Sequence, residues 1–362
     1  MKRFIGFEHG MGIGGWLTNY KRFNVLPQDR RLCLTIGDME HFATYITEKD
    51  VEYIASLGMD HIRLGFDQIV FEEAPYNYRE EIFTHIDNFI SWCKKYDLNI
   101  VLNMHKAVGN YCDIKEDVEL LEDNELQNRF ISLWLAFEKR YNNDNSIAFE
   151  LLNEVRDVNP QKWNDLAEKT VNAIRQLNKE RKIILGSTSW NIPHNLCHLK
   201  LFDDENIIYT FHAYEPLEFT HQQGVLQANP LYYNRKMPYP CDIERYRDYH
   251  KTVFNNENAY PDYEIMDINY IRAYLKPAID FINQNPDKIL WCGEFGTIRH
   301  ADIKWRENWM RDVITVLKEN NIPYCVWNYL STPNDGNRFS LVDDDNREIL
   351  SDEMAKIIRG EV

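Results

Sequence analysis

The feature that most constrains the fold of this chain is a repeated alternation between short apolar runs and amphipathic stripes. Short apolar runs are typical of parallel strands that are buried on both faces of a sheet. Between them, apolar residues recur at three- and four-residue spacing, as they do on the buried face of a helix. The eight runs are Phe4–Phe7, His61–Phe66, Ile100–Met104, Ile147–Leu152, Ile183–Leu185, Ile207–Phe211, Ile289–Cys292 and Tyr324–Trp327.

The helical stripes fall within residues 82–93, 126–141, 163–177 and 309–317, and Thr47 with Asp50 is typical of a helix start that Gly58 would end. Eight strand–helix units in 362 residues match the size of a (β/α)8 TIM barrel, an α/β fold whose structural rival here is a doubly wound sheet. We therefore predict a barrel that spans residues 1–362 as a single catalytic domain. The alternation breaks in two stretches, which we expect to be long loops at the rim: residues 17–46 after the first strand and about 215–265 after the sixth.

Charge and composition exclude several classes of partner. The chain has 41 Lys and Arg against 57 Asp and Glu, a formal charge of −16, so its field repels the phosphates of nucleic acids and anionic lipids. No apolar run is long enough for a membrane span, and Glu8 and His9 interrupt the apolar start, so no signal-peptide core is seen. Seven scattered cysteines without a CxxC pair indicate reduced thiols. We expect a cytoplasmic protein, unless a leader has been removed.

Polar residues gather where the predicted strands end. On a barrel these ends meet in one cup, where active sites lie. Taken singly, each residue has an ordinary explanation as an ion pair, a hydrogen-bonded core histidine or a packed ring. The residues at or just after the strand ends are Arg63, His105, Asn153, Glu154, His212, Tyr214, Glu294 and Trp327.

Together these residues suit the hydrolysis of glycosides. That reaction uses two carboxyl groups, and about 5–5.5 Å between them gives retention of anomeric configuration. Glu154 and Glu294 would face each other across the cup, and their surroundings must separate their pKa values. Arg63 would keep one carboxylate ionised, while a less charged and partly desolvated site would keep the other protonated. Trp327 offers a flat apolar face to a sugar ring.

Short motifs around these positions point to a known family. The motifs are Gly14-Gly15-Trp16, HIRLGF around Arg63, LNMH at His105, LLNE at Glu154, FHAY at His212 and Tyr214, CGEFG at Glu294 and VWNY at Trp327. With them the chain resembles, nearly end to end, glycoside hydrolase family five, the cellulase family of the barrel-fold clan. Among its members the chain is most similar to small bacterial endoglucanases.

The resemblance implies an enzyme that hydrolyses β-linked glucans or gluco-oligosaccharides with retention, in the manner of an endo-β-1,4-glucanase, without a cofactor or metal. Glu154 would be the acid/base and Glu294 the nucleophile of a double displacement, and Asn153 would bond the sugar 2-hydroxyl. It further implies Arg63 and Tyr214 as partners of the nucleophile, His105 and His212 as residues lining the subsite around the cleaved bond, and Trp327 as a platform under the sugar.

Departures from the family pattern keep the sugar open. Many cellulases of the family carry a second histidine where Lys106 stands, and Gly65 replaces a usual proline. We therefore count Lys106 as a substrate-binding residue and keep a β-mannosidase or mannanase, or an enzyme for another β-glucan linkage (1,3 or exo-acting), as the alternative. The aromatic residues of the second long stretch either wall a subsite or anchor the loop: Tyr214, Phe219, Tyr232, Tyr233 and Tyr239.

Three other classes of function are weaker. A noncatalytic carbohydrate-binding barrel would keep the aromatic cup but has no need of both glutamates. Residues 10–15 formally match the GxGxxG dinucleotide fingerprint, but no apolar helix stripe follows them. A metal-dependent hydrolase would need a cluster of histidines and aspartates, and no His-x-His follows the first strand. Asp343–Asp345 lacks the glycine and distant glutamate of a calcium loop.

Overall fold

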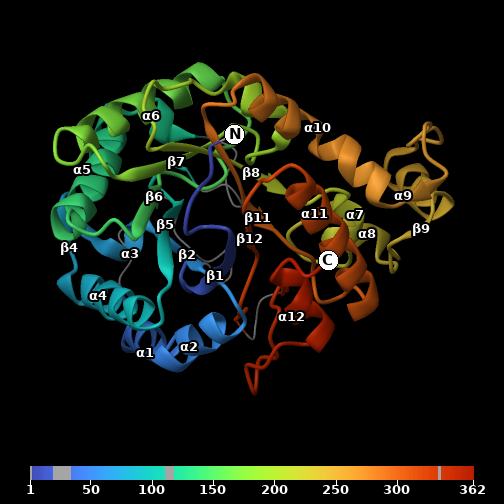
Figure 1. The fold of residues 1–362 in the computed structure, drawn as a ribbon, viewed down its shortest axis with the longest axis horizontal. Coiled ribbons are helices and arrows are strands. Elements are labelled where there is room, and N and C mark those ends of the chain that lie inside the picture. Colours follow the sequence, from blue (N-terminus) through green and yellow to red (C-terminus); the bar gives the residue numbers. More distant parts are fainter. Residues whose placement is uncertain (1, 19–33, 111–117, 333–335) are drawn as a thin grey trace.

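The predicted barrel is confirmed in a computed structural model, which describes residues 2–18, 34–110, 118–332 and 336–362. Eight parallel strands close into a cylinder in their order along the chain (Figure 1). Going around the barrel, the strands are β1 (His9–Leu17), β2 (His61–Asp67), β5 (Asn99–Lys106), β6 (Ile147–Glu150), β7 (Lys182–Gly186), β8 (Ile207–Ala213), β11 (Ile289–Phe295) and β12 (Tyr324–Val326).

The helices surround this cylinder (Figure 1). The predicted stripes are the buried faces of real helices; in α4, for example, Ile82, Ile86, Phe89 and Cys93 are all buried. Thr47 and Asp50 form the predicted capping box, and Gly58 follows the end of that helix with φ +84°. The main helices are α2 (Glu48–Ser56), α4 (Glu80–Lys95), α5 (Asn124–Tyr141), α6 (Pro160–Arg175), α10 (Ile268–Gln284), α11 (Ile303–Glu319) and α12 (Asp352–Ile358).

Shorter elements lie in the connections. They are α1 (Ile36–Thr44), α3 (Gln68–Phe71), α7 (Leu217–Thr220), α8 (Ala228–Tyr233), α9 (Glu244–Phe254), the 3₁₀ turns η2 (Glu119–Leu121) and η3 (Pro193–His198), and the two-stranded sheets β3 (Glu72–Ala74) with β4 (Asn77–Tyr78) and β9 (Cys241–Asp242) with β10 (Ile265–Met266). Within the described ranges no helix is both long and apolar enough to cross a membrane. The cysteines described there are free thiols: Cys93, Cys197, Cys241, Cys292 and Cys325.

The first strand was predicted at the wrong place. Phe4 and Phe7 do not form a strand; their rings stack on each other at 4.1 Å and join a separate apolar cluster with Trp291. The strand is the glycine-rich stretch that follows. A Cβ added at Gly12 would lie 2.7 Å from the Trp327 ring, so this strand needs glycines because large side chains cross it closely. Because residues 10–15 lie inside β1, they do not form the loop between strand and helix that a dinucleotide site requires.

The two long stretches differ in what can be described. Of residues 17–46, positions 19–33 lie outside the described residues, and the part after them forms α1. Residues 215–265 carry α7, α8, α9 and the small β9–β10 sheet, which stand to one side of the barrel (Figure 1). In this stretch Phe219, Tyr233 and Tyr239 are buried and Tyr232 is 73% exposed. Most of these aromatic residues therefore anchor the segment, and Tyr214 alone of the five lines the cavity described below.

Candidate active site

The carboxyl ends of the strands open into a cavity of about 470 Å³. Most of the residues predicted at the strand ends lie on its wall: His105, Glu154, His212, Tyr214, Glu294 and Trp327. Each comes from the end of a barrel strand or from the residues just after it, because parallel strands point their carboxyl ends to the same face. The position of these residues at the predicted strand ends was therefore enough to predict that they lie in one cavity.

Arg63 is the buried centre of charge beneath the cavity. Its side chain is fully buried on β2, and Nε and Nη2 donate to the two oxygens of Glu150 at 2.6 and 2.9 Å. Nη1 donates to Glu294 Oε2 at 2.5 Å, and Nη2 also donates to Asn153 Oδ1 at 2.7 Å. The guanidinium thus fixes three side chains in a fork geometry that only arginine provides.

Glu150 is the residue of this network that sequence reasoning missed. It is the last residue of β6 and is completely buried. The predicted strand continued to Leu152, so Glu150 fell inside the prediction and not at its end. A signal was nevertheless present, because an acidic residue within the apolar stretch FELLNEV must be paired when it is buried. Its partner is Arg63, which carries one positive charge for the two carboxylates Glu150 and Glu294.

Glu294 lies within β11 and accepts two hydrogen bonds. Arg63 donates to Oε2, and the Tyr214 hydroxyl donates to Oε1 at 2.6 Å. Burial raises the pKa of Glu294 above its ordinary value, although His212, Arg63 and Tyr214 each oppose this. Arg63 therefore does not lower the pKa of this carboxyl below its usual range, because burial outweighs its charge and Glu154 adds to the rise. Burial and the neighbouring Glu294 charge also raise the pKa of Tyr214, which stays a phenol that donates.

Glu154 faces Glu294 from the end of the fourth barrel strand. Its backbone is left-handed, with φ +37°, which is uncommon outside glycine and is a feature of functional sites. Its Oε1 lies 2.8 Å from His212 Nδ1. One oxygen of Glu154, one oxygen of Glu294 and a ring nitrogen of His212 all lie within 4.8 Å of one another. This separation is close to the roughly 5–5.5 Å typical of retaining glycosidases and shorter than the roughly 6.5–9.5 Å of inverting ones.

The same three side chains are the donors with which a metal ion could be held in the described part of the chain. Each of them already has a protein partner, since Glu294 pairs with Arg63 and Glu154 pairs with His212. A cation here would have to compete with the buried guanidinium for Glu294. The donor set therefore fits a carboxylate pair with an arginine better than it fits a metal centre.

The histidines of the cavity are buried and neutral. Burial lowers the pKa of His212 to about 4 and also lowers the pKa of His105 well below its ordinary value. The His105 ring stacks on Trp327, with centroids 5.4 Å apart and an interplanar angle of 8°. Trp327 in turn packs across Gly12 and Gly14 of β1. The two stacked rings form the wall on this side of the cavity.

Besides Arg63, two predicted residues are not among the described residues that line the cavity. Asn153 is buried and bound to Arg63. Lys106 is buried at the end of β5, opposite Asp67, and is not among the described residues that line the cavity. Sequence reasoning did not single out several lining residues from the loops: Arg156, Trp190, Ile192, His221, Leu226, Gln227, Asn328, Asn337 and Phe339. No pattern marks them, since their position depends on how each loop folds.

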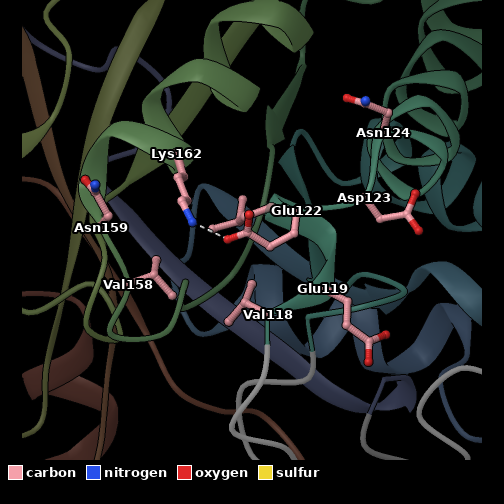
Figure 2. Close-up of a pocket in the computed structure, with 9 residues that line it drawn as sticks. Val118, Glu119, Glu122, Asp123, Asn124, Val158, Asn159 and Lys162 are labelled. Atoms are coloured by element: carbon pink, nitrogen blue, oxygen red, sulfur yellow. Dashed lines mark hydrogen bonds and ion pairs between the residues drawn. The ribbon is translucent and has the colours of Figure 1, made fainter.

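A second cavity, of about 890 Å³, lies at the loops after β5 and β6. Figure 2 shows its mixed lining, with Glu119, Glu122 and Asp123 beside Val118 and Val158. Glu122 is paired with Lys162 (Figure 2). It shares no lining residue with the first cavity, and within the described ranges it lacks histidines and facing buried carboxylates. Size alone therefore does not mark the reactive site.

Comparison with known proteins agrees with this geometry. The model of the family "Cellulase (glycosyl hydrolase family 5)" matches residues 33–332. Endoglucanase C of Acetivibrio thermocellus is 37% identical over 98% of both chains, and cellodextrinase A of Ruminococcus flavefaciens is 29% identical over 89% of this chain and 85% of its own. Among solved structures, Thermotoga maritima Cel5A, in complex with cellobiose or with mannotriose, superposes with a TM-score of 0.71 at 23% identity, over 97% of both chains. This chain belongs to glycosyl hydrolase family 5, the cellulase family, and is an enzyme that hydrolyses O-glycosyl bonds.

Proposed function

We propose that this enzyme cleaves β-1,4-linked glucans and gluco-oligosaccharides at internal bonds with retention, and that Glu294 is the nucleophile and Glu154 the acid/base. The observation that carries the proposal is the approach of the two carboxylates to within 4.8 Å at the mouth of the barrel. The relatives named endoglucanase and cellodextrinase support a β-glucan substrate. One domain, residues 1–362, would carry the whole reaction.

In the first step, a carboxylate oxygen of Glu294 attacks the anomeric carbon. The bond from that carbon to the glycosidic oxygen breaks, and Glu154 gives its proton to the departing oxygen. Arg63 and Tyr214 fix the direction of the nucleophile through their hydrogen bonds to its two oxygens. Asn153, turned by Arg63, would present its amide nitrogen to the sugar 2-hydroxyl, and the wall of Trp327 would carry the ring.

In the second step, water attacks the same anomeric carbon. Glu154, now a carboxylate, takes a proton from the water, and the ester bond to Glu294 breaks. The hydroxyl ends on the face that the leaving group occupied, so the configuration is retained. The half-exposed rim formed by Trp190, Ile192 and Leu226 would accommodate the leaving part of the chain, which favours cleavage at internal bonds.

The nucleophile is tested by Glu294→Gln. Turnover of cello-oligosaccharides is expected to fall by at least about 10⁴-fold, because the amide cannot form the ester intermediate. Glu307→Gln is the matched control, since Glu307 is equally buried but lies on α11, outside the cavity. Product anomers are followed by NMR in the wild type. Near-native turnover by Glu294→Gln, or inverted products from the wild type, would refute the assignment and would favour a noncatalytic or inverting barrel.

The acid/base role of Glu154 is tested with leaving groups. Glu154→Ala should slow cello-oligosaccharides by about 10²-fold or more, because the departing sugar oxygen needs a proton. Dinitrophenyl cellobioside, whose leaving group needs no proton, should form the glycosyl-enzyme at close to the normal rate. Equal losses on both substrates would contradict the role.

A β-mannan substrate is the second candidate. It is favoured by the neighbour that was solved with mannotriose as well as with cellobiose. The two sugars differ at the 2-hydroxyl, which Asn153 would contact. Initial rates on cello-, laminari- and manno-oligosaccharides of equal length, with product lengths recorded, decide between the two candidates and between internal and terminal cleavage. A preference for the manno series of tenfold or more would replace the glucan proposal.

A further inference from the structure

His212 lies between two side chains of different hydrogen-bonding character. Its Nδ1 faces Glu154 Oε1 at 2.8 Å, and its Nε2 faces the amide nitrogen of Asn191 at 3.3 Å. A neutral imidazole has one N–H and one bare nitrogen, and an amide nitrogen can only donate. With the amide in this orientation, Nε2 accepts from Asn191 and the ring proton is on Nδ1, where it donates to Glu154.

Asn191 is held firmly in this position. Its side chain is fully buried, and its backbone carbonyl accepts the His212 N–H at 2.8 Å. It ends a run of three left-handed residues, Ser189, Trp190 and Asn191, with φ of 58°, 59° and 57°. Such a run is uncommon for residues with side chains, so the surrounding structure must impose it.

The segment before Asn191 is also joined to the segment after Glu154. The Trp190 N–H donates to the Val155 carbonyl at 2.9 Å, and the Ser189 N–H donates to the Arg156 carbonyl at 3.1 Å. Gly186, at the end of β7, leaves the space for the amide, because a Cβ added there would lie 2.4 Å from Asn191 Oδ1. The acid/base residue, the histidine and the asparagine are thus one rigid unit built from three successive barrel strands.

We propose that Asn191 is a positioning residue that fixes the tautomer of His212, so that Glu154 Oε1 accepts a hydrogen bond and the catalytic proton is carried by Oε2. The proposal rests on the acid/base role proposed for Glu154. When Glu154 is ionised, the carboxylate itself favours the Nδ1–H tautomer. When Glu154 is protonated, only Asn191 favours the Nδ1–H tautomer. In the other tautomer the bare Nδ1 would accept the Glu154 proton from Oε1, so this proton would point towards the histidine and away from the leaving oxygen.

The charged groups around His212 are consistent with a neutral ring. Besides Glu154, those that act on it are Glu294, Arg63 and Glu150, whose opposite signs partly cancel, and burial is the largest influence on the ring. His105 is a further neighbour and is itself neutral. The tautomer, rather than the charge, is therefore the property of His212 that Asn191 can control.

Asn191→Asp is the sharpest variant. Aspartate has the same shape and tolerates the left-handed backbone, but its carboxylate can only accept, so it reverses the hydrogen bond to Nε2. We expect kcat/KM on cello-oligosaccharides to fall by about 10²-fold, and kcat/KM on dinitrophenyl cellobioside to change by less than about threefold. Asn195→Asp is the matched control: Asn195 donates to Ser189 Oγ at 2.9 Å in the same loop and does not contact His212 in the described structure. Equal losses on both substrates, or none, would overturn the proposal.

The tautomer itself is read from ¹⁵N NMR of the imidazole nitrogens of His212 in the wild-type enzyme. The expected result is a protonated Nδ1 and a bare Nε2, with protonation of Nε2 in Asn191→Asp. A wild-type ring that carries its proton on Nε2 would overturn the proposal even if the variant fails to fold. This measurement needs no turnover, so it also separates the two hypotheses. Equal losses on both substrates in Glu154→Ala would remove the acid/base role, whereas the NMR result concerns Asn191 alone.

Discussion

At the scale of single residues, Arg63 is shared between two carboxylates, Glu150 and the proposed nucleophile Glu294. Glu150 takes two of the guanidinium's hydrogen bonds, and Glu294 takes one. In Glu150→Gln the positive charge would act mainly on Glu294, so the pKa of Glu294 should fall. In the proposed mechanism Glu294 attacks as a carboxylate, so the acid limb of the kcat/KM profile should move to lower pH. The titration belongs to the coupled pair of glutamates, so the limb is compared between variants and not assigned to one group.

The same substitution should weaken the fold. Arg63 keeps Glu294 as its ion-pair partner, but its two hydrogen bonds to the Glu150 carboxylate lose their charge and one of them loses its acceptor, which should cost roughly 1–3 kcal/mol. Urea denaturation of Glu150→Gln should show this loss, and the Glu307→Gln control should lose much less. A variant of normal stability whose acid limb does not move would show that Glu150 does not share Arg63 with the nucleophile.

Residue-scale predictions succeeded where a residue's place follows from topology alone. Glu154, Glu294, His212 and Trp327 could be found because every parallel strand ends on the same face of the barrel. Asn191 could not be found in this way, because the sequence Ser-Trp-Asn does not indicate three consecutive residues with left-handed backbone conformation. The role of Lys106 stays a prediction, because it is buried and is not among the described residues that line the cavity.

At the scale of elements, seven of the predicted strands overlap barrel strands and the first does not. Apolar periodicity finds strands that bury large side chains. β1 alternates buried Met11 and Ile13 with glycines, since the rings of Trp327 and His61 occupy the space where side chains at the glycine positions would be. Apolar periodicity reflects the side chains that a strand itself contributes to the core. It gives no information about rings from neighbouring elements that fill the space beside glycines. The first strand was therefore predicted at the nearest aromatic residues, Phe4 and Phe7.

The glycines of β1 allow a matched pair of substitutions. In Gly12→Ala the new Cβ would lie 2.7 Å from Trp327, and in Gly10→Ala it would lie 2.1 Å from His61, whose ring packs against Phe7 and Trp291. Both should lose about 1–3 kcal/mol of stability through overpacking. Only Gly12→Ala should also raise KM for cello-oligosaccharides, because it displaces the sugar platform. KM is measured well below both melting temperatures, and equal KM values would argue against Trp327 as the platform.

At the scale of the whole molecule, the buried histidines should make stability depend on pH. Burial lowers the pKa of His212 and of His221 to about 4 in the folded chain, from an ordinary 6.5. Between these values the unfolded chain binds protons that the folded chain does not, so stability is lost as the pH falls from about 6.5 towards 4. Each such histidine contributes up to about 1.4 kcal/mol per pH unit. His221→Gln should therefore flatten the plot of unfolding free energy against pH in this range, and an unchanged slope would contradict the buried neutral state of His221.

The net charge of −16 should affect the reaction only when the substrate is charged. A neutral cello-oligosaccharide is not steered by the field of the protein, so its kcat/KM should change by less than about twofold between about 0.05 and 0.5 M NaCl. Carboxymethyl cellulose is a polyanion and is repelled, and salt shortens the range of that repulsion, with a Debye length of about 10 Å at 0.1 M. Its kcat/KM should therefore rise with salt over the same range. Parallel rate measurements on the two substrates separate charge repulsion from any effect of salt on the fold, because a change in the fold would alter both rates together.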